Sequence, residues 1–154
     1  MIRADWQTGP LQAEELAAVV AIDAAMTGHD RGAFYARRLA RTLAAPARFV
    51  HVGLRRDGTI VGFVLARLTD GEFGEPDRGA ALDALAIHPD HQGGGGGQAL
   101  IAALLAVLER KGVARIVTEV DWEARALCGF LSASGFAPAE QLVVERPLAP
   151  GAAF

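Results

Sequence analysis

Apolar residues recur along the chain with two periods, and together these predict a succession of helices and strands. In residues 13–28 and 30–44 they return every three or four positions, as on one face of an amphipathic helix. Gly28 is suited to end the first of these helices, and Asp30 to cap the second. A short strand is expected before both, at residues 2–6.

A β-hairpin is predicted next. Residues 48–55 place two alternating sets of side chains on opposite faces, as a strand does. Asp57-Gly58 favours a tight turn, and residues 59–68 then form the partner strand. Residues 70–78 are polar and rich in glycine and proline, so we expect an exposed loop there.

The second half of the chain continues the alternation. Residues 80–87 are almost continuously apolar, which is typical of a strand covered on both faces, and Asp83 is the exception. A strand at residues 113–120, a helix ended by Gly135 and a strand at 141–146 are also expected. Between residues 87 and 113, one apolar stripe predicts the clearest helix of the chain: Leu100, Ile101, Leu104, Leu105 and Leu108. With no internal repeat and no linker, residues 1–154 are predicted to form a single α/β domain.

Composition narrows the class of protein. Apolar residues make up 51% of the 154 and charged residues 21%, a normal balance for a folded domain. The net charge of -3 gives no electrostatic reason to expect nucleic acid or an anionic membrane as partner. The first residues lack the apolar core of a secretory signal, and no run approaches the roughly 20 apolar residues of a membrane helix. A single cysteine, Cys128, suits a reducing compartment, so we expect a cytoplasmic protein.

Five consecutive glycines, Gly93 to Gly97, separate the strand at 80–87 from the clearest helix. Such a turn aims several backbone N–H groups at one point, and the helix N-terminus adds about half a positive charge. A phosphate or pyrophosphate is therefore the favoured ligand, with a flexible linker as the alternative. A P-loop has Lys-Ser or Lys-Thr after its last glycine, where this chain has Gln98-Ala99. A Rossmann fingerprint begins directly after the strand, whereas Pro89 to Gln92 precede the glycines here. Four histidines and one cysteine show no metal-ligand spacing, so no metal site is predicted.

This segment resembles the GNAT superfamily of acyl-CoA-dependent N-acyltransferases. The family signature is an apolar residue, any residue and Pro, followed by Gln/Arg-x-x-Gly-x-Gly/Ala and a helix. Ile87-His88-Pro89 and the run from Gln92 to Gly97 match it in residue type and spacing, and Gly135-Phe136 match the usual end of the last helix. The predicted order of elements also agrees over nearly the whole chain.

The resemblance implies a mixed central sheet of six to seven strands with four helices, in which two central parallel strands splay apart to hold acyl-CoA. These strands would be residues 80–87 and 113–120. The first would contact the pantetheine arm with its backbone, and the glycine turn would hold the pyrophosphate. The implied cofactor-binding residues are Leu85, Ala86, Ile87, Gln92, Gly93, Gly94, Gly95, Gly96, Gly97 and Gln98.

Departures from the family pattern alter the expected binding. Many relatives carry Lys or Arg at the position of Gly94, a branched apolar residue at Gly96 and Arg at Gln98. Phosphate binding in this chain would therefore rest on backbone N–H groups and the helix dipole. Five glycines also cost ordering entropy, so we expect a mobile loop and modest cofactor affinity.

Two carboxylates are candidates for the base that accepts a proton from the amine. Asp83 lies in an apolar strand, where burial would raise its pKa towards a useful range. The alternative is a structural aspartate paired with arginine or backbone. Glu119, near the end of the neighbouring strand, is the second candidate. Leu131 stands where relatives often have a tyrosine that protonates the leaving thiolate.

The resemblance thus implies an N-acetyltransferase that uses acetyl-CoA as co-substrate and needs no metal. Its acceptor would be the primary amine of a small molecule or peptide, which attacks the thioester directly. A non-catalytic acyl-CoA-binding or sensor domain of the same fold is the alternative, and the leucine at position 131 supports it. A homodimer is compatible with the family, and neither nucleic acid nor a membrane is an expected partner.

Overall fold

A computed structural model describes residues 5–71 and 77–149. The chain divides into two compact units, residues 1–119 and 120–154, and each is described by itself. No helix in the described residues is long and apolar enough to cross a membrane. The predicted loop at 70–78 lies for the most part outside the described residues.

Two helices open the first unit where the apolar periodicity predicts them. A 3-10 turn, η1 (Ala13–Glu15), leads into α1 (Leu16–Thr27), which ends at Gly28 in the left-handed conformation with φ 75°. α2 (Gly32–Ala44) follows, and the Asp30 carboxylate accepts a hydrogen bond of 2.8 Å from the Gly32 N–H. The connection between α1 and α2 thus has a glycine where φ is positive and an aspartate that accepts a hydrogen bond at the start of α2.

The predicted hairpin is present as β2 (Phe49–Arg56) and β3 (Thr59–Asp70), which pair antiparallel. Its turn places Asp57 at φ 51° and Gly58 at φ 78°, the positive values that a two-residue hairpin turn needs. The sheet continues to β4 (Arg78–Ile87), antiparallel to β3, and to β5 (Arg115–Val117), parallel to β4. The strand order is β1-β2-β3-β4-β5.

The first strand is displaced from its predicted position. β1 is Gln7–Gly9 and pairs with β2, whereas residues 2–4 of the predicted strand at 2–6 lie outside the described residues and Asp5 and Trp6 are not in a strand. β1 is a largely exposed edge strand, held by backbone pairing with residues 53–55 of β2. An edge strand of this kind needs no apolar alternation, so hydropathy gave no signal for it.

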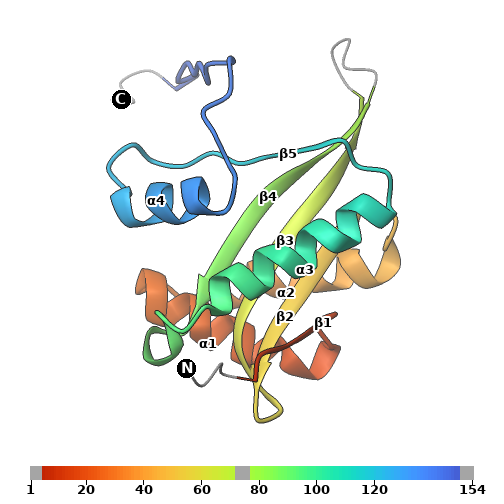
Figure 1. Cartoon of the computed structure of the whole chain (residues 1–154), viewed down its shortest axis with the longest axis vertical. Coiled ribbons are helices and arrows are strands. Elements are labelled where there is room, and N and C mark those ends of the chain that lie inside the picture. The colour runs from red at the N-terminus through yellow and green to blue at the C-terminus, as the bar shows by residue number, and fades with distance from the viewer. Residues whose placement is uncertain (1–4, 72–76, 150–154) are drawn as a thin grey trace. The chain divides into compact units, whose positions relative to one another are not determined.

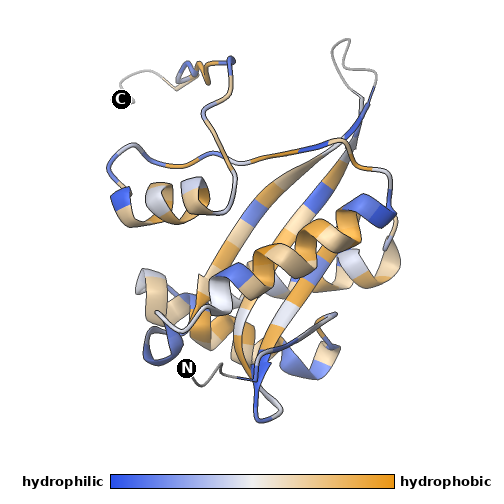
Figure 2. Ribbon diagram, viewed as in Figure 1, coloured by the Kyte–Doolittle hydropathy of each residue, from blue (hydrophilic) through white to orange (hydrophobic). Residues whose placement is uncertain are grey.

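Helices cover both faces of the sheet (Figure 1). α3 (Gly96–Arg110) contacts β2, β3 and β4 on one face, while α1 contacts β3 and β4 and α2 contacts β2 on the other. Side chains alternate accordingly along β3. Phe63 and Leu65 join the buried cluster that includes Val19, Ile22 and Tyr35, and Gly62 lies close to Leu100 of α3. Figure 2 shows β2, β3 and β4 to be largely hydrophobic, as a sheet covered on both faces must be.

A buried ionic cluster joins α1 to α2. The Asp23 carboxylate, on a residue 3% exposed, accepts hydrogen bonds from the Arg31 guanidinium and, at 2.8 Å, from the Tyr35 hydroxyl. The hydrogen bond from Arg31 lowers the pKa of Asp23, although burial acts in the opposite direction. Burial and the neighbouring Asp23 carboxylate raise the pKa of Tyr35. The tyrosine therefore stays neutral and serves as a fixed donor.

The predicted sheet of six to seven strands is wrong by at least one strand, since five are present in the described residues. The predicted strand at 113–120 is reduced to Arg115–Val117. In the second unit, α4 (Arg125–Ala133) stops two residues before Gly135, which has a φ of 91°. The predicted strand at residues 141–146 is wrong, because these residues form no strand. Leu142, Val143 and Val144 are 85%, 72% and 87% exposed, so this segment has the side-chain pattern of a strand without a paired neighbour.

Candidate acyl-CoA site

The strand β4 loses its neighbour on one side midway along its length. Its parallel pairing with β5 covers only residues 79–81, and the Thr118 hydroxyl then donates to the Leu82 carbonyl at 3.0 Å. On the β3 side the register shifts at the next residue, because Leu65 pairs with Ala84 and Ala66 with Leu82. Asp83 is thus the extra residue of a β-bulge, which bends a strand and increases its twist. The bulge lies where β5 and β4 part.

Beyond the bulge, the backbone of β4 has no partner strand along that edge in the described residues. The His88 N–H donates to Val61 of β3 at 2.8 Å, and successive residues of a strand direct their N–H groups to opposite sides. The backbone of Ile87 and Leu85 therefore faces the side from which β5 has departed, while that of Ala86 faces β3. In the described residues no strand pairs with this edge, so an extended ligand can bind it as an added strand would.

The glycine run begins directly after this edge. Pro89–His91 form a short 3-10 turn, η2, and α3 then starts at Gly96 with Gly95 as its N-cap. Gly93 and Gly95 have φ values of 79° and 84°, in the left-handed region that favours glycine. In the described part of the chain, the backbone N–H groups of Gly93 to Gly95 donate no backbone hydrogen bond, and those of Gly96 and Gly97 belong to the first turn of α3, where N–H groups have no partner within the helix. These donors, at a helix N-terminus, form a site for an anion.

Two side chains hold the glycine run in place. Gln92 donates its side-chain amide to the Ile87 carbonyl at 2.9 Å and contacts the Met26 sulfur at 3.2 Å, which ties the start of the run to β4 and α1. The Trp6 indole N–H donates to the Gly94 carbonyl at 2.9 Å. The sequence pattern pointed to Gln92 but gave no signal for Trp6, which is 88 positions away.

Asp83 lies within a group of charged and polar residues on the α2 face of the sheet. Its carboxylate accepts a hydrogen bond from Arg38 at 2.8 Å and from Arg67 at 3.0 Å, and its side chain is 20% exposed. The pairing with arginine is the alternative considered from the sequence. Both partners of Asp83 come from distant elements, α2 and β3, so they could not be identified from β4 alone.

Arg38 is the centre of that group. Its guanidinium lies 4.7 Å from the centre of the Phe49 ring, and its Nε and Nη2 are buried without a hydrogen-bond partner in the described residues. The nearby His51, only 7% exposed, contacts the Thr42 hydroxyl at 2.6 Å. Burial, together with the charge of Arg38, lowers the pKa of His51 to about 4, so His51 is neutral at pH 7.

The other candidate catalytic groups belong to other parts of the chain. Glu119 is exposed and follows β5 by two residues. Leu131, at the position where the family often has a tyrosine, lies in α4 of the second unit and is 5% exposed. In the described residues no group of three or more histidine, cysteine, aspartate or glutamate side chains is placed to hold a metal ion.

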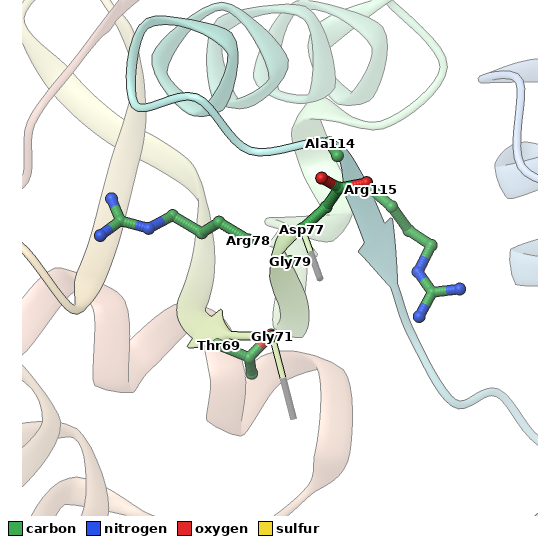
Figure 3. A pocket seen from close by; sticks show the side chains of 7 residues that line it. All are labelled: Thr69, Gly71, Asp77, Arg78, Gly79, Ala114 and Arg115. Atoms are coloured by element: carbon green, nitrogen blue, oxygen red, sulfur yellow. The ribbon is translucent and has the colours of Figure 1, made fainter. Parts of the chain in front are cut away.

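A cavity of about 360 Å³ lies elsewhere (Figure 3). It is lined by Thr69, Gly71, Asp77, Arg78, Gly79, Ala114 and Arg115, at the end of β4 opposite to the glycine run. None of the candidate site residues lines it. An extended ligand bound along a strand edge needs no deep cavity, so the edge of β4 and the glycine run stay the candidate site.

An open strand edge that leads into a helix N-terminus is suited to an elongated ligand that ends in phosphate. A family model described as Acetyltransferase (GNAT) family matches residues 16–136, and the chain therefore belongs to the GNAT acetyltransferases. It is an acyltransferase. No curated protein sequence matches the chain significantly.

Solved structures of acetyltransferases share its fold. The aminoglycoside N-acetyltransferase AAC(6')-Iy in complex with CoA is 16% identical, with a TM-score of 0.78 over 94% of this chain and 95% of that one. A ribosomal-protein-alanine N-acetyltransferase from Brucella melitensis biovar Abortus 2308 is 19% identical, with a TM-score of 0.74 over 92% and 98%. An acetyltransferase from Trypanosoma brucei is 18% identical, with a TM-score of 0.72 over 93% and 100%.

Proposed function

We propose that this protein is an acetyl-CoA-dependent N-acetyltransferase that acetylates the primary amine of a small molecule or a protein. The observation that carries the proposal is the adjacency of the open β4 edge to the N–H groups of Gly93 to Gly97. Coenzyme A has an extended pantetheine arm joined to a pyrophosphate, and these two parts match the edge and the glycine run. The relative solved with CoA has the same fold.

In the proposed reaction the amine nitrogen attacks the thioester carbonyl carbon directly. An N–C bond forms, the C–S bond breaks, and the electron pair of that bond leaves on sulfur. The Leu85 or Ile87 N–H, which faces the open edge, can donate to the carbonyl oxygen as negative charge develops on it. The amine loses its proton to a base, and the thiolate takes a proton from water, since Leu131 has no proton to give.

The base is proposed among the two carboxylates singled out from the sequence. Both oxygens of Asp83 accept hydrogen bonds from arginines, so a proton taken up by Asp83 would weaken its ion pairs with Arg38 and Arg67. Glu119 is exposed and makes no ion pair within the described residues. We therefore favour Glu119 as the base and assign to Asp83 the positioning of Arg38 and Arg67.

The alternative, a non-catalytic acyl-CoA sensor of the same fold, is favoured by one observation. A buried leucine, Leu131, replaces the tyrosine that often acts as the acid in relatives. A sensor would bind acetyl-CoA as tightly as an enzyme and would release no thiol with any amine.

Calorimetric titration with acetyl-CoA tests the cofactor assignment, and we expect a single site. Absence of both heat and thermal stabilisation would remove the assignment. An assay for released thiol with a panel of amines then separates the enzyme from the sensor. The panel begins with aminoglycosides, glucosamine-6-phosphate and N-terminal alanine peptides, because structural relatives are named for these acceptors.

With an active acceptor in hand, Glu119→Gln and Asp83→Asn are compared across pH. We expect Glu119→Gln to lower kcat by about 100-fold or more, the usual contribution of a general base. Asp83→Asn keeps the side-chain shape, so its effect should fall mainly on KM for the acceptor. An unchanged rate in Glu119→Gln together with a large loss of kcat in Asp83→Asn would reverse the two roles.

We also propose a homodimer, as the family resemblance implies. The single domain proposed from the sequence, residues 1–154, includes both compact units. The family match runs from residue 16 to residue 136 and so continues past the boundary at 119, which supports one domain. Sedimentation equilibrium of the full chain distinguishes a monomer from a dimer.

A further inference from the structure

We propose that Trp6 is a positioning residue for cofactor binding, which orients the peptide units of the glycine run towards the pyrophosphate. The inference rests on the proposed function, because the ligand held by the run is the pyrophosphate of acetyl-CoA. The juxtaposition that carries it is the hydrogen bond from the Trp6 indole to the Gly94 carbonyl, 2.9 Å long and joining residues 88 positions apart.

The direction of this hydrogen bond determines where the next N–H points. The Gly94 carbonyl and the Gly95 N–H belong to one peptide unit, and the described chain has no cis peptide bond. In a trans peptide the C=O and N–H groups point in opposite directions. Holding the carbonyl against Trp6 therefore directs the Gly95 N–H to the far side of the run from the indole.

The indole ring also restricts the run by contact. A Cβ atom on Gly94 would lie 3.2 Å from Trp6 Cζ2, and one on Gly96 would lie 3.5 Å from the same atom. The first distance is closer than an ordinary van der Waals contact, so a side chain at position 94 would require the indole ring to shift.

Arg56, at the end of β2, also contacts the indole ring of Trp6. Its guanidinium carbon lies 5.7 Å from the centre of the Trp6 ring, within the range of a cation–π interaction. The hairpin β2–β3, the segment before β1 and the glycine run are thereby linked. Five consecutive glycines have many accessible conformations, and a fixed partner reduces the entropy that binding must remove.

Trp6→Phe tests the inference because it keeps an aromatic ring and removes the N–H donor. The probes are acetyl-CoA and S-acetylpantetheine, which has the thioester and the arm but no pyrophosphate. We expect Kd for acetyl-CoA to rise about 3- to 10-fold, the range for one lost hydrogen bond, with Kd for S-acetylpantetheine unchanged. In turnover, KM for acetyl-CoA should rise while kcat stays the same.

Trp122→Phe is the matched control, since Trp122 is the only other tryptophan and is 89% exposed. It should leave both Kd values at wild-type level. Equal losses for the two probes in Trp6→Phe would indicate a general structural role and overturn the inference, as would an unchanged Kd for acetyl-CoA.

A second measurement separates this inference from the proposed function. NMR order parameters of the Gly93 to Gly97 amides in the ligand-free protein should be lower in Trp6→Phe than in wild type and in Trp122→Phe. If wild type binds no acetyl-CoA, the cofactor assignment fails, whereas the order parameters still support or overturn the role of Trp6 in ordering the run. If Trp6→Phe does not fold, Gly94→Ala, which crowds the indole, should raise Kd selectively for acetyl-CoA.

Discussion

Individual side chains on the α2 face of the sheet combine burial with charge, and His51 shows the consequence most directly. The Thr42 hydroxyl donates its proton to the Arg38 carbonyl at 3.1 Å, so it can only accept from His51. We therefore assign the ring N–H of His51 to Nε2, which donates to Thr42. Nδ1 is buried and has no partner in the described residues. The fold thus holds a neutral imidazole beside an arginine.

This arrangement predicts a loss of stability in mild acid. His51 has a pKa of about 4 in the folded state, against about 6.5 when unfolded. Above pH 6.5 both states are neutral and stability does not depend on His51. As pH falls from 6.5 to 4, only the unfolded state gains the proton, so the free energy of unfolding falls by up to about 1 kcal/mol per pH unit. Below pH 4 this loss ends.

Urea unfolding between pH 7 and pH 5 measures the effect in wild type and in His51→Phe, which cannot bind the proton. The slope of stability against pH should be flatter in His51→Phe. His29→Gln, at an exposed histidine, is the control and should keep the wild-type slope. Identical slopes in all three proteins would show that His51 is protonated alike in both states.

Residues joined across long stretches of chain were the hardest to predict. The glycine run and Gln92 were identified by a local pattern, because the chemistry of a phosphate loop is contained within a few consecutive residues. Trp6 and Arg38 gave no such signal, because each acts through one contact that exists only after the sheet has formed. The placing of Asp83 in a bulge likewise depends on its register with β3.

Among the elements, the junction of β4 with α3 is where packing and binding meet. Gly96, the first residue of α3, is buried, and a Cβ atom there would lie 2.7 Å from Leu54 Cδ2 and 3.3 Å from Ile87 Cδ1. The helix N-terminus can therefore approach β2 this closely only because position 96 has no side chain.

Gly96→Ala should weaken acetyl-CoA binding by displacing the start of α3. Alanine favours a helix by about 0.5–1 kcal/mol over glycine, so the change in thermal stability should be small while Kd rises about 10-fold. Calorimetry measures Kd, and Leu54→Val in the same chain should restore part of it by removing the Cδ2 atom. Gly129→Ala in α4 meets no described atom within 4 Å and is the control. Normal binding by Gly96→Ala would show that α3 tolerates the displacement.

Helices and the hairpin were predicted well because their signals are local: an apolar period, a glycine at a helix end, an Asp-Gly turn. The prediction was wrong at the sheet margins. β1 has a largely exposed, polar sequence and pairs with β2, whereas residues 141–146 contain the apolar run Leu142–Val144 and yet form no strand. Residue types of this kind fit a sheet, but a strand also requires a neighbour, which the local sequence does not reveal.

At the scale of the whole molecule, the sizes of the two compact units favour folding as one. The second unit comprises residues 120–154, and chains below about 40 residues usually need a disulfide, a metal or a partner to fold alone. Cys128 is the single cysteine, so no disulfide can form within the chain. The second unit should therefore depend on the first for its stability.

Scanning calorimetry of the full chain should show one transition, with a calorimetric enthalpy equal to the van't Hoff enthalpy, because neither unit unfolds separately. Saturating acetyl-CoA should move that single transition upward without dividing it, since a ligand that binds only the folded state stabilises everything that unfolds with its site. Circular dichroism should give the same midpoint as calorimetry. Two resolved transitions, with acetyl-CoA shifting one of them alone, would show that the family match spans two independently folding units.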